Sequence, residues 1–194
     1  PRQQLRVSLK KALDVAVAHE KAQAEYMLPI EGKIPKSYNG KEVVTATPRD
    51  WTSGFFPATM WLLYEHTGDE QLKEYVLPKI QLTWYFEGAF HFEKQMFEEA
   101  LVCFNNAFNG FQELGLTSNA ISALKQVAIV NYQTYHIEEA IRKYEQALLM
   151  SQSLNDSIAQ MDIAQELHRL CGIIGDMEGT AKYSNLMDFL IANS

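Results

Sequence analysis

The sequence predicts an all-α protein whose helices pair into hairpins, and three observations lead to this prediction. Apolar residues recur at three- to four-residue intervals through residues 3–28 without a proline or glycine, which is typical of an amphipathic helix. Residues 79–194 contain no proline at all. Short breaks divide that part evenly, so six helices in three hairpins are expected there. The breaks fall at residues 94–96, 115–119, 133–135, 155–157 and 175–176.

Residues 29–50 interrupt the helical pattern because they contain three prolines and two glycines. A long loop is therefore expected, with a turn within residues 35–40 and one short extended piece at residues 42–45. The second helix is expected to begin near Thr52 or Ser53, because either side chain can cap a helix N-terminus.

The chain is expected to turn again after this helix, and a second part with a different sequence pattern is expected to begin after Pro78. Gly68 suits the left-handed position that follows a helix, and Asp69 can cap the next one. Pro78 is expected to end or kink that next helix, since proline lacks the backbone donor that a helix interior uses. We therefore predict two parts, residues 1–78 and residues 79–194.

Composition excludes several classes of function. The 194 residues carry a net charge of −7 with dispersed basic residues, so no nucleic acid is expected as a partner. No apolar run approaches the roughly 20 residues of a spanning helix, and the N-terminus does not open like a signal peptide, so no membrane is expected either. Cys103 and Cys171 lack metal-ligand spacing, and Glu93 so close to His91 is too little for a metal site. No metal or cofactor is therefore expected.

The second part contains an internal repeat. The segment "MFEEALVCFNNAF" (96–108) aligns with "HIEEAIRKYEQAL" (136–148) at an offset of 40 residues. Small residues coincide at Ala100 and Ala140, and aromatic residues coincide at Phe104 and Tyr144. A weaker third copy, "DMEGTAKYSNLMDFL" (176–190), has Thr180 at the small position and Tyr183 one residue early for the aromatic.

This pattern resembles the tetratricopeptide repeat (TPR), a family that builds solenoids of stacked helical hairpins. The family's other small residue is expected twelve positions before the first, where Gly88 and Ala128 stand, and Trp84 occupies its tryptophan position. The offset of 40 exceeds the usual period of about 34 residues, so longer helices are expected. The resemblance implies hairpins at about residues 81–116, 118–154 and 157–192, the last of which is a candidate C-terminal cap.

Stacked hairpins of this kind leave a concave face, which implies a peptide or protein ligand. The alternative is that the residues of this face are ordinary surface or packing residues. The carboxylate clamp of some TPR proteins is not assembled, because Tyr85 and Ala89 stand where polar groups would be needed. The candidates to point into the concave face are Tyr85, Lys125, Tyr132, Gln165 and Arg169.

Residues 11–77 resemble the N-terminal portion of the unsaturated glucuronyl hydrolases, which are (α/α)6 barrels. The resemblance rests on "KALDVAVAHEKAQAEY", "GKIPKSYNG" and "DWTSGFFPATMWLLYEHTGDE", in which Ala58 replaces a usual glycine. It implies a barrel-like helical hairpin with a long loop. It also implies that Trp51 stacks on a uronic-acid ring while Arg49 or Asp50 meets polar groups.

The alternative for this aromatic stretch is that its side chains are core. The family's catalytic aspartates lie on later helices, one of them after a histidine, and no His-Asp pair occurs in this sequence. A general acid also needs a pocket that shifts its pKa, which one hairpin does not supply. The residues expected in the core under this alternative are Trp51, Phe55, Phe56, Trp61, Leu62 and Tyr64.

The two resemblances lead to three hypotheses. The first is a noncatalytic helical-repeat module that binds a peptide or protein. The second is a fragment of an unsaturated glucuronyl hydrolase, and the third is sugar binding without catalysis, with an unsaturated uronic-acid oligosaccharide as ligand. A fusion, a truncated chain and a composite sequence stay open. The repeats favour a cytoplasmic location, whereas a native glycosidase-like part would allow an exported or periplasmic one.

Overall fold

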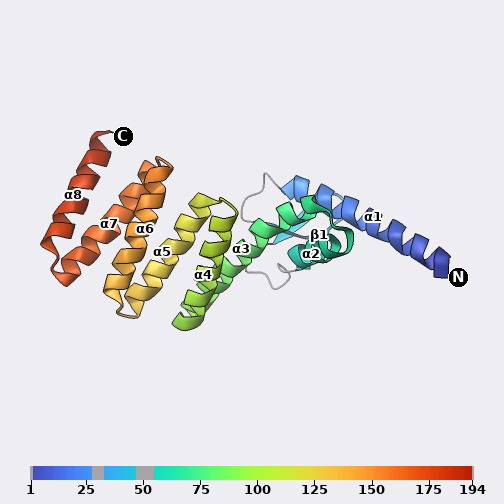
Figure 1. Cartoon of the computed structure of the whole chain (residues 1–194), viewed down its shortest axis with the longest axis horizontal. Helices are drawn as coiled ribbons and strands as arrows, with labels where there is room; N and C mark the ends of the chain where they lie inside the picture. Colours follow the sequence, from blue (N-terminus) through green and yellow to red (C-terminus); the bar gives the residue numbers. More distant parts are fainter. Residues whose placement is uncertain (1, 28–32, 47–54, 194) are drawn as a thin grey trace. The chain divides into compact units, whose positions relative to one another are not determined.

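Eight helices and one β-hairpin make up the described part of the chain, which in this computed structural model comprises residues 2–27, 33–46 and 55–193. Helices therefore dominate, as predicted. The expected cap at Thr52 or Ser53 lies outside the described residues. Among the described helices, none has the length and apolar content that crossing a membrane requires. In chain order the elements are α1 (Arg2–Met27), β1 (Ile34–Tyr38), β2 (Val43–Ala46), α2 (Phe55–Thr67), α3 (Glu70–Glu93), α4 (Phe97–Glu113), α5 (Thr117–Gln133), α6 (Ile137–Ser153), α7 (Ser157–Ile174) and α8 (Met177–Ala192) (Figure 1).

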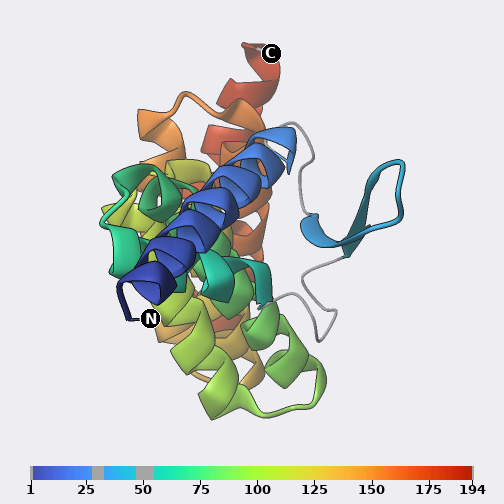
Figure 2. The same ribbon diagram turned by 90° about the vertical axis from the view of Figure 1, so that its right-hand side faces the viewer.

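A β-hairpin occupies residues 34–46, where the sequence predicted a long loop. Strands β1 and β2 pair antiparallel (Figure 2). The Oδ1 atom of Asn39 accepts hydrogen bonds of 3.0 Å from the backbone N–H groups of Lys41 and Glu42. Gly40 has a φ of 90°, which glycine adopts without strain. The predicted extended piece thus became β2, and the turn chemistry closes a hairpin.

The first compact unit, Pro1–Phe86, has a core contributed by α1, α2 and α3. Phe56 is buried as expected, and Trp61 and Tyr64 pack partly buried against the core. The core prediction was wrong for Phe55 and Leu62, which are 61% and 55% exposed. These two residues are seven positions apart and share the helix face opposite the core. The buried cluster consists of Ala24, Phe56, Met60, Leu63, Leu72 and Val76.

The junction between α2 and α3 follows the prediction. Gly68 has a φ of 69°. The Oδ1 atom of Asp69 accepts a 3.1 Å hydrogen bond from the backbone N–H of Gln71, as expected of a helix cap. Lys21 of α1 lies 2.5 Å from the carboxylate of Asp69, and its hydrogen bond lowers the pKa of that carboxyl. This ion pair connects the junction to α1.

Pro78 does not end a helix, because α3 continues through it from Glu70 to Glu93. A proline interior to a helix removes one hydrogen bond to the carbonyl four residues earlier. That residue, Glu74, is exposed, so water can satisfy its carbonyl. The predicted boundary at residue 78 therefore lies within a continuous helix. The two compact units divide between Phe86 and Glu87, and independent folding of the two parts stays a prediction.

The second unit, Glu87–Ser194, contains the repeats, and in it α4 to α8 follow one another as neighbours (Figure 1). The pattern residues occupy the helix contacts, as the TPR resemblance predicted. Ala100, Ala140 and Ala128 are fully buried, and so is the aromatic Phe104. A Cβ atom added to Gly88 would lie 2.8 Å from the Phe104 ring. The absence of a side chain at Gly88 therefore lets α3 and α4 approach closely.

The third hairpin adds polar contacts at the positions that hold small and aromatic residues in the first two. His168 stands 40 residues after Ala128, at the position of the second small residue. Its Nδ1 lies 3.0 Å from the carbonyl oxygen of Thr180, and since a carbonyl only accepts, Nδ1 donates. The early aromatic Tyr183 is 1% exposed, and its hydroxyl donates a 2.6 Å hydrogen bond to Glu145 of α6.

The turns between repeat helices share one geometry. At the first, the N–H of Met96 bonds to the carbonyl of His91 and that of Gln95 to Phe92, both at 2.9 Å, which is the Schellman arrangement. The same bond pattern recurs at the four later turns. Because α4, α5 and α6 each have 17 residues, the helices and turns together account for the 40-residue period. The left-handed residues are Gln95, Gly115, Tyr135, Asn155 and Gly175.

Substituting Gly88 by alanine is expected to destabilise the protein. Overpacking a core costs about 1–3 kcal/mol, and over most of this range the cost is larger than the roughly 1 kcal/mol that alanine gains over glycine inside a helix. Chemical denaturation measures the difference. Gly172→Ala is the matched control, because nothing lies within 4 Å of its added Cβ, and it should stabilise. Equal stabilisation by both substitutions would contradict the close contact with Phe104.

Substituting Tyr135 by glycine is expected to stabilise the protein by about 0.5–1 kcal/mol, because a left-handed backbone strains most side chains. Tyr135 is 89% exposed, so its side chain contributes little packing. Thermal and denaturant unfolding measure the change. The converse substitution, Gly115→Ala, should destabilise, and stabilisation by it would contradict the turn geometry.

Candidate functional site

Four of the five residues predicted for the concave face lie in one unit. Lys125 and Tyr132 belong to α5, and Gln165 and Arg169 belong to α7. Tyr85 lies in the first unit, where its ring contacts Phe86 edge-on with centroids 5.6 Å apart. The four residues of the repeat unit are therefore the ones whose mutual arrangement is defined.

Two contacts join α5 to α7. The ammonium group of Lys125 forms an ion pair with the carboxylate of Asp162. The guanidinium of Arg169 lies 4.5 Å from the centre of the Tyr132 ring, a cation–π geometry. Lys125 and Tyr132 are seven residues apart, as are Asp162 and Arg169, so each pair spans two helical turns on one face. Of the predicted residues, Tyr132 and Arg169 therefore contact each other, whereas Lys125 pairs with Asp162, which was not predicted.

Arg169 is held by a second partner. Its Nη2 and Nε atoms lie 2.7 and 3.1 Å from Oε2 of Glu166, one turn earlier on α7. This hydrogen bond is the main cause that raises the pKa of Arg169. Beneath these charges lies Tyr144 of α6, whose pKa is raised mainly by burial and further by Glu166. The charged face is therefore paired within the protein and preorganised.

An apolar pocket of about 380 Å³ adjoins the charged contacts. Asp162 lines it and also pairs with Lys125, so the pocket and the charged face are continuous. Gln165 contributes an exposed amide to its wall. The remaining lining residues are Ser157, Ile158, Met161, Leu190 and Ile191. We call the face formed by Lys125, Tyr132, Asp162, Gln165, Glu166 and Arg169 the α5–α7 surface.

Sequence reasoning missed the acidic members of this surface. Asp162 follows Lys125 by 37 residues, and Arg169 follows Tyr132 by the same interval, three less than the repeat offset. The signals that could have found them are the opposite charges of Lys125 and Asp162 at that interval, and of Glu166 and Arg169 three residues apart on one helix. The predicted sugar-binding residues Arg49, Asp50 and Trp51 lie outside the described residues.

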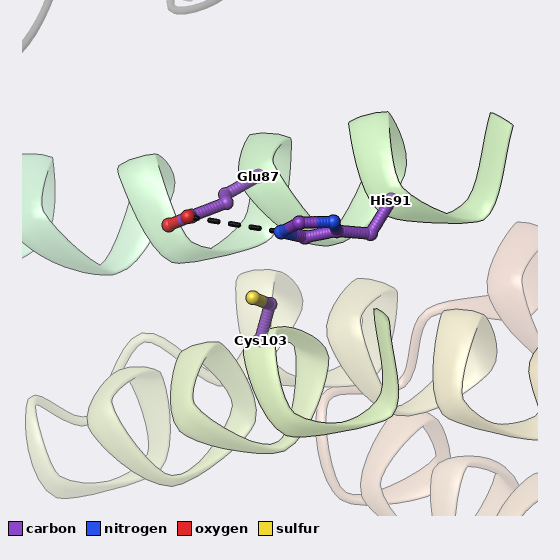
Figure 3. Close-up of side chains that lie close together, drawn as sticks. All are labelled: Glu87, His91 and Cys103. Atoms are coloured by element: carbon purple, nitrogen blue, oxygen red, sulfur yellow. Dashed lines mark ion pairs between the residues drawn. The ribbon is translucent and has the colours of Figure 1, made fainter. Parts of the chain in front are cut away.

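Within the described part of the chain, three side chains lie close enough to hold a metal ion. They are Glu87 and His91 of α3 and Cys103 of α4, whose ligand atoms all lie within 4.8 Å of one another (Figure 3). From the sequence, His91 was expected to have only Glu93 as a neighbouring ligand, which is too little for a metal site. The spacing of Glu87 and His91 by four residues on one helix was the available signal.

The fold is similar to that of known helical-repeat structures. No family model matches the chain. BtubC (BKLC) from P. vanneervenii superimposes with a TM-score of 0.56 at 16% identity, covering 73% of this chain and 57% of that one. A Podosopora anserina structure, described as the nearly identical TPR-like repeats of a kinesin light chain, superimposes with a TM-score of 0.52 at 11% identity. The match covers 99% of this chain and 91% of that one.

A short stretch is similar to a curated enzyme. An unsaturated glucuronyl hydrolase from Formosa agariphila is 58% identical over 42 residues, which make up 21% of this chain and 10% of that protein. The match therefore spans only a tenth of the length of that relative. The expected barrel-like arrangement of the N-terminal part is not seen in these comparisons. The chain is thus similar to TPR-like repeat proteins in fold and, over a short segment, to a glucuronyl hydrolase in sequence.

Proposed function

We propose that the unit Glu87–Ser194 is a noncatalytic module that binds a peptide or protein segment on the α5–α7 surface. The observation that supports this most is the continuity of an apolar pocket with a preorganised polar face. Binding sites commonly combine an apolar cavity with a few fixed polar groups. The TPR-like fold is consistent with such a role.

The pocket defines the chemistry of the ligand. It accepts an apolar side chain between Ile158 and Leu190, and the amide of Gln165 can hydrogen-bond a peptide backbone. Lys125 and Arg169 already have acidic partners in the protein. A ligand carboxylate would have to replace those partners, so the two cations support binding mainly by holding the surface beside the pocket in a fixed arrangement. A peptide with an apolar anchor side chain is therefore the expected ligand.

The test selects peptides from a random displayed library against the full chain and measures their affinity for variants. Lys125→Ala combined with Arg169→Ala removes both cations of the surface. We expect at least about tenfold weaker binding, a loss of about 1.4 kcal/mol. Arg142→Ala combined with Lys143→Ala is the matched control, because these residues carry the same charges on α6 and both pair with Glu139.

A second variant tests the pocket by itself. Ile158 is 85% exposed, so Ile158→Asp should leave the fold intact while placing a charge at the pocket wall. Binding should again weaken by at least about tenfold. Selected peptides that bind the Lys125→Ala, Arg169→Ala variant and the Ile158→Asp variant as tightly as they bind the α6 control would refute the proposal. Circular dichroism of each variant confirms that folding is unchanged.

A second candidate function is favoured by the 58% identity to the glucuronyl hydrolase. Under it, residues 11–77 retain binding of an unsaturated uronic-acid oligosaccharide, with Trp51 as the stacking platform and Arg49 or Asp50 beside it. Turnover is not expected, because the family's catalytic aspartates are not found in this sequence. Tryptophan fluorescence, titrated with an unsaturated disaccharide, should change in the wild type and lose that change in Trp51→Phe. An unchanged wild-type signal would exclude this candidate.

A further inference from the structure

Glu87, His91 and Cys103 converge from two helices at the edge of the first repeat hairpin. Glu87 and His91 lie one helical turn apart on α3 and therefore share a face. Cys103 of α4 points toward them (Figure 3). The Nε2 atom of His91 lies 3.8 Å from Oε1 of Glu87, and all three ligand atoms lie within 4.8 Å of one another.

The close helix contact brings these side chains together. Glu87 directly precedes Gly88, and Cys103 directly precedes Phe104. Gly88 and Phe104 approach so closely that a Cβ on the glycine would lie 2.8 Å from the ring. The residues beside this contact are therefore held near one another by packing that does not involve them. A preformed arrangement of this kind lowers the cost of collecting ligands.

The hydrogen bonding of His91 leaves its ring incompletely satisfied. Its Nδ1 is buried and has no hydrogen-bond partner among the described residues. Its Nε2 contacts Glu87 at 3.8 Å, which is longer than a hydrogen bond. Nε2 is the ring nitrogen nearer Glu87 (Figure 3), so it is the atom of His91 available to an ion.

Repeat packing does not explain the three residues either. At an offset of 40 residues, the equivalent positions hold Val127, Asn131 and Lys143. At an offset of 80 they hold Leu167, Cys171 and Tyr183. The second and third hairpins therefore form with other side chains at these positions. The combination of a carboxylate, an imidazole and a thiol is specific to the first hairpin.

We propose that Glu87, His91 and Cys103 form a binding site for one transition-metal dication of the zinc class. Zinc takes thiolate, imidazole and carboxylate ligands at about 2.0–2.3 Å, so tetrahedral ligand atoms lie roughly 3.3–3.8 Å apart. The observed separations reach that range through small side-chain rotations. A thiolate and an imidazole disfavour magnesium and calcium, which prefer oxygen ligands. The bound ion would link α3 to α4 and leave a fourth position for water or another ligand.

The test uses cobalt, which replaces zinc in such sites and absorbs light when bound to a thiolate. The full chain, metal-free and reduced, is titrated with cobalt chloride. We expect a near-ultraviolet thiolate-to-cobalt band that saturates at one ion per chain and disappears when zinc is added. Magnesium in excess should leave the band unchanged. No band, or a band removed by magnesium, would refute the site.

Three variants locate the ligands. Cys103→Ser should abolish the band, whereas Cys171→Ser, at the other buried cysteine, should retain it. His91→Gln and Glu87→Gln should each weaken cobalt binding by more than about tenfold, because even groups that only orient metal ligands contribute about 10–100-fold. Circular dichroism checks the fold of each. A band that survives Cys103→Ser, or binding unaffected by His91→Gln in a folded variant, would overturn the proposal.

Discussion

The close approach of paired helices is the constraint on which the repeat unit depends. At Gly88 it is extreme, because the Phe104 ring fills the space that a Cβ would need. Ala128 and Ala140 are likewise fully buried in the second hairpin. Small residues remove the side-chain layer that normally separates helices by about 8–10 Å, and an aromatic ring then fills the remaining gap. This contact also places neighbouring side chains, including Cys103 beside Glu87 and His91.

Because α4, α5 and α6 have equal lengths, the same local contact recurs at a regular interval along the chain. Each turn uses the same Schellman bonds around one left-handed residue, so successive helices begin at regular positions along the chain. The contacts between α5 and α7 depend on that regularity, because Lys125 and Tyr132 meet residues at the same interval of 37. One inserted residue in α6 would displace both contacts together. The face proposed to bind a ligand is therefore defined by the period of the repeat.

The sequence predicted the structural features that recur in each repeat, but it did not predict features that occur only once in the chain. Helix positions and the buried roles of Ala100 and Phe104 follow from a pattern seen twice. The β-hairpin was read as a loop, because proline and glycine mark turns without revealing that the flanking segments pair. Pro78 was expected to end or kink its helix, but α3 continues through it because the tertiary structure tolerates the lost hydrogen bond. The pairing of Lys125 with Asp162, and of His91 with Cys103, depends on how helices stack in space, which spacing along one helix does not report.

The polar contacts of the third hairpin affect how the repeat unit unfolds. In α4 seven residues are buried, whereas in α8 only Tyr183 and Leu190 are. Repeat arrays gain stability mainly from contacts between neighbours, so a weakly buried terminal helix can detach while the others stay folded. Opening of α8 would break the hydrogen bonds from His168 to Thr180 and from Tyr183 to Glu145. It would also remove Leu190 and Ile191 from the wall of the apolar pocket. The occupancy of that pocket and the fraying of the last helix are therefore linked equilibria, and a ligand held there would slow amide exchange throughout α8.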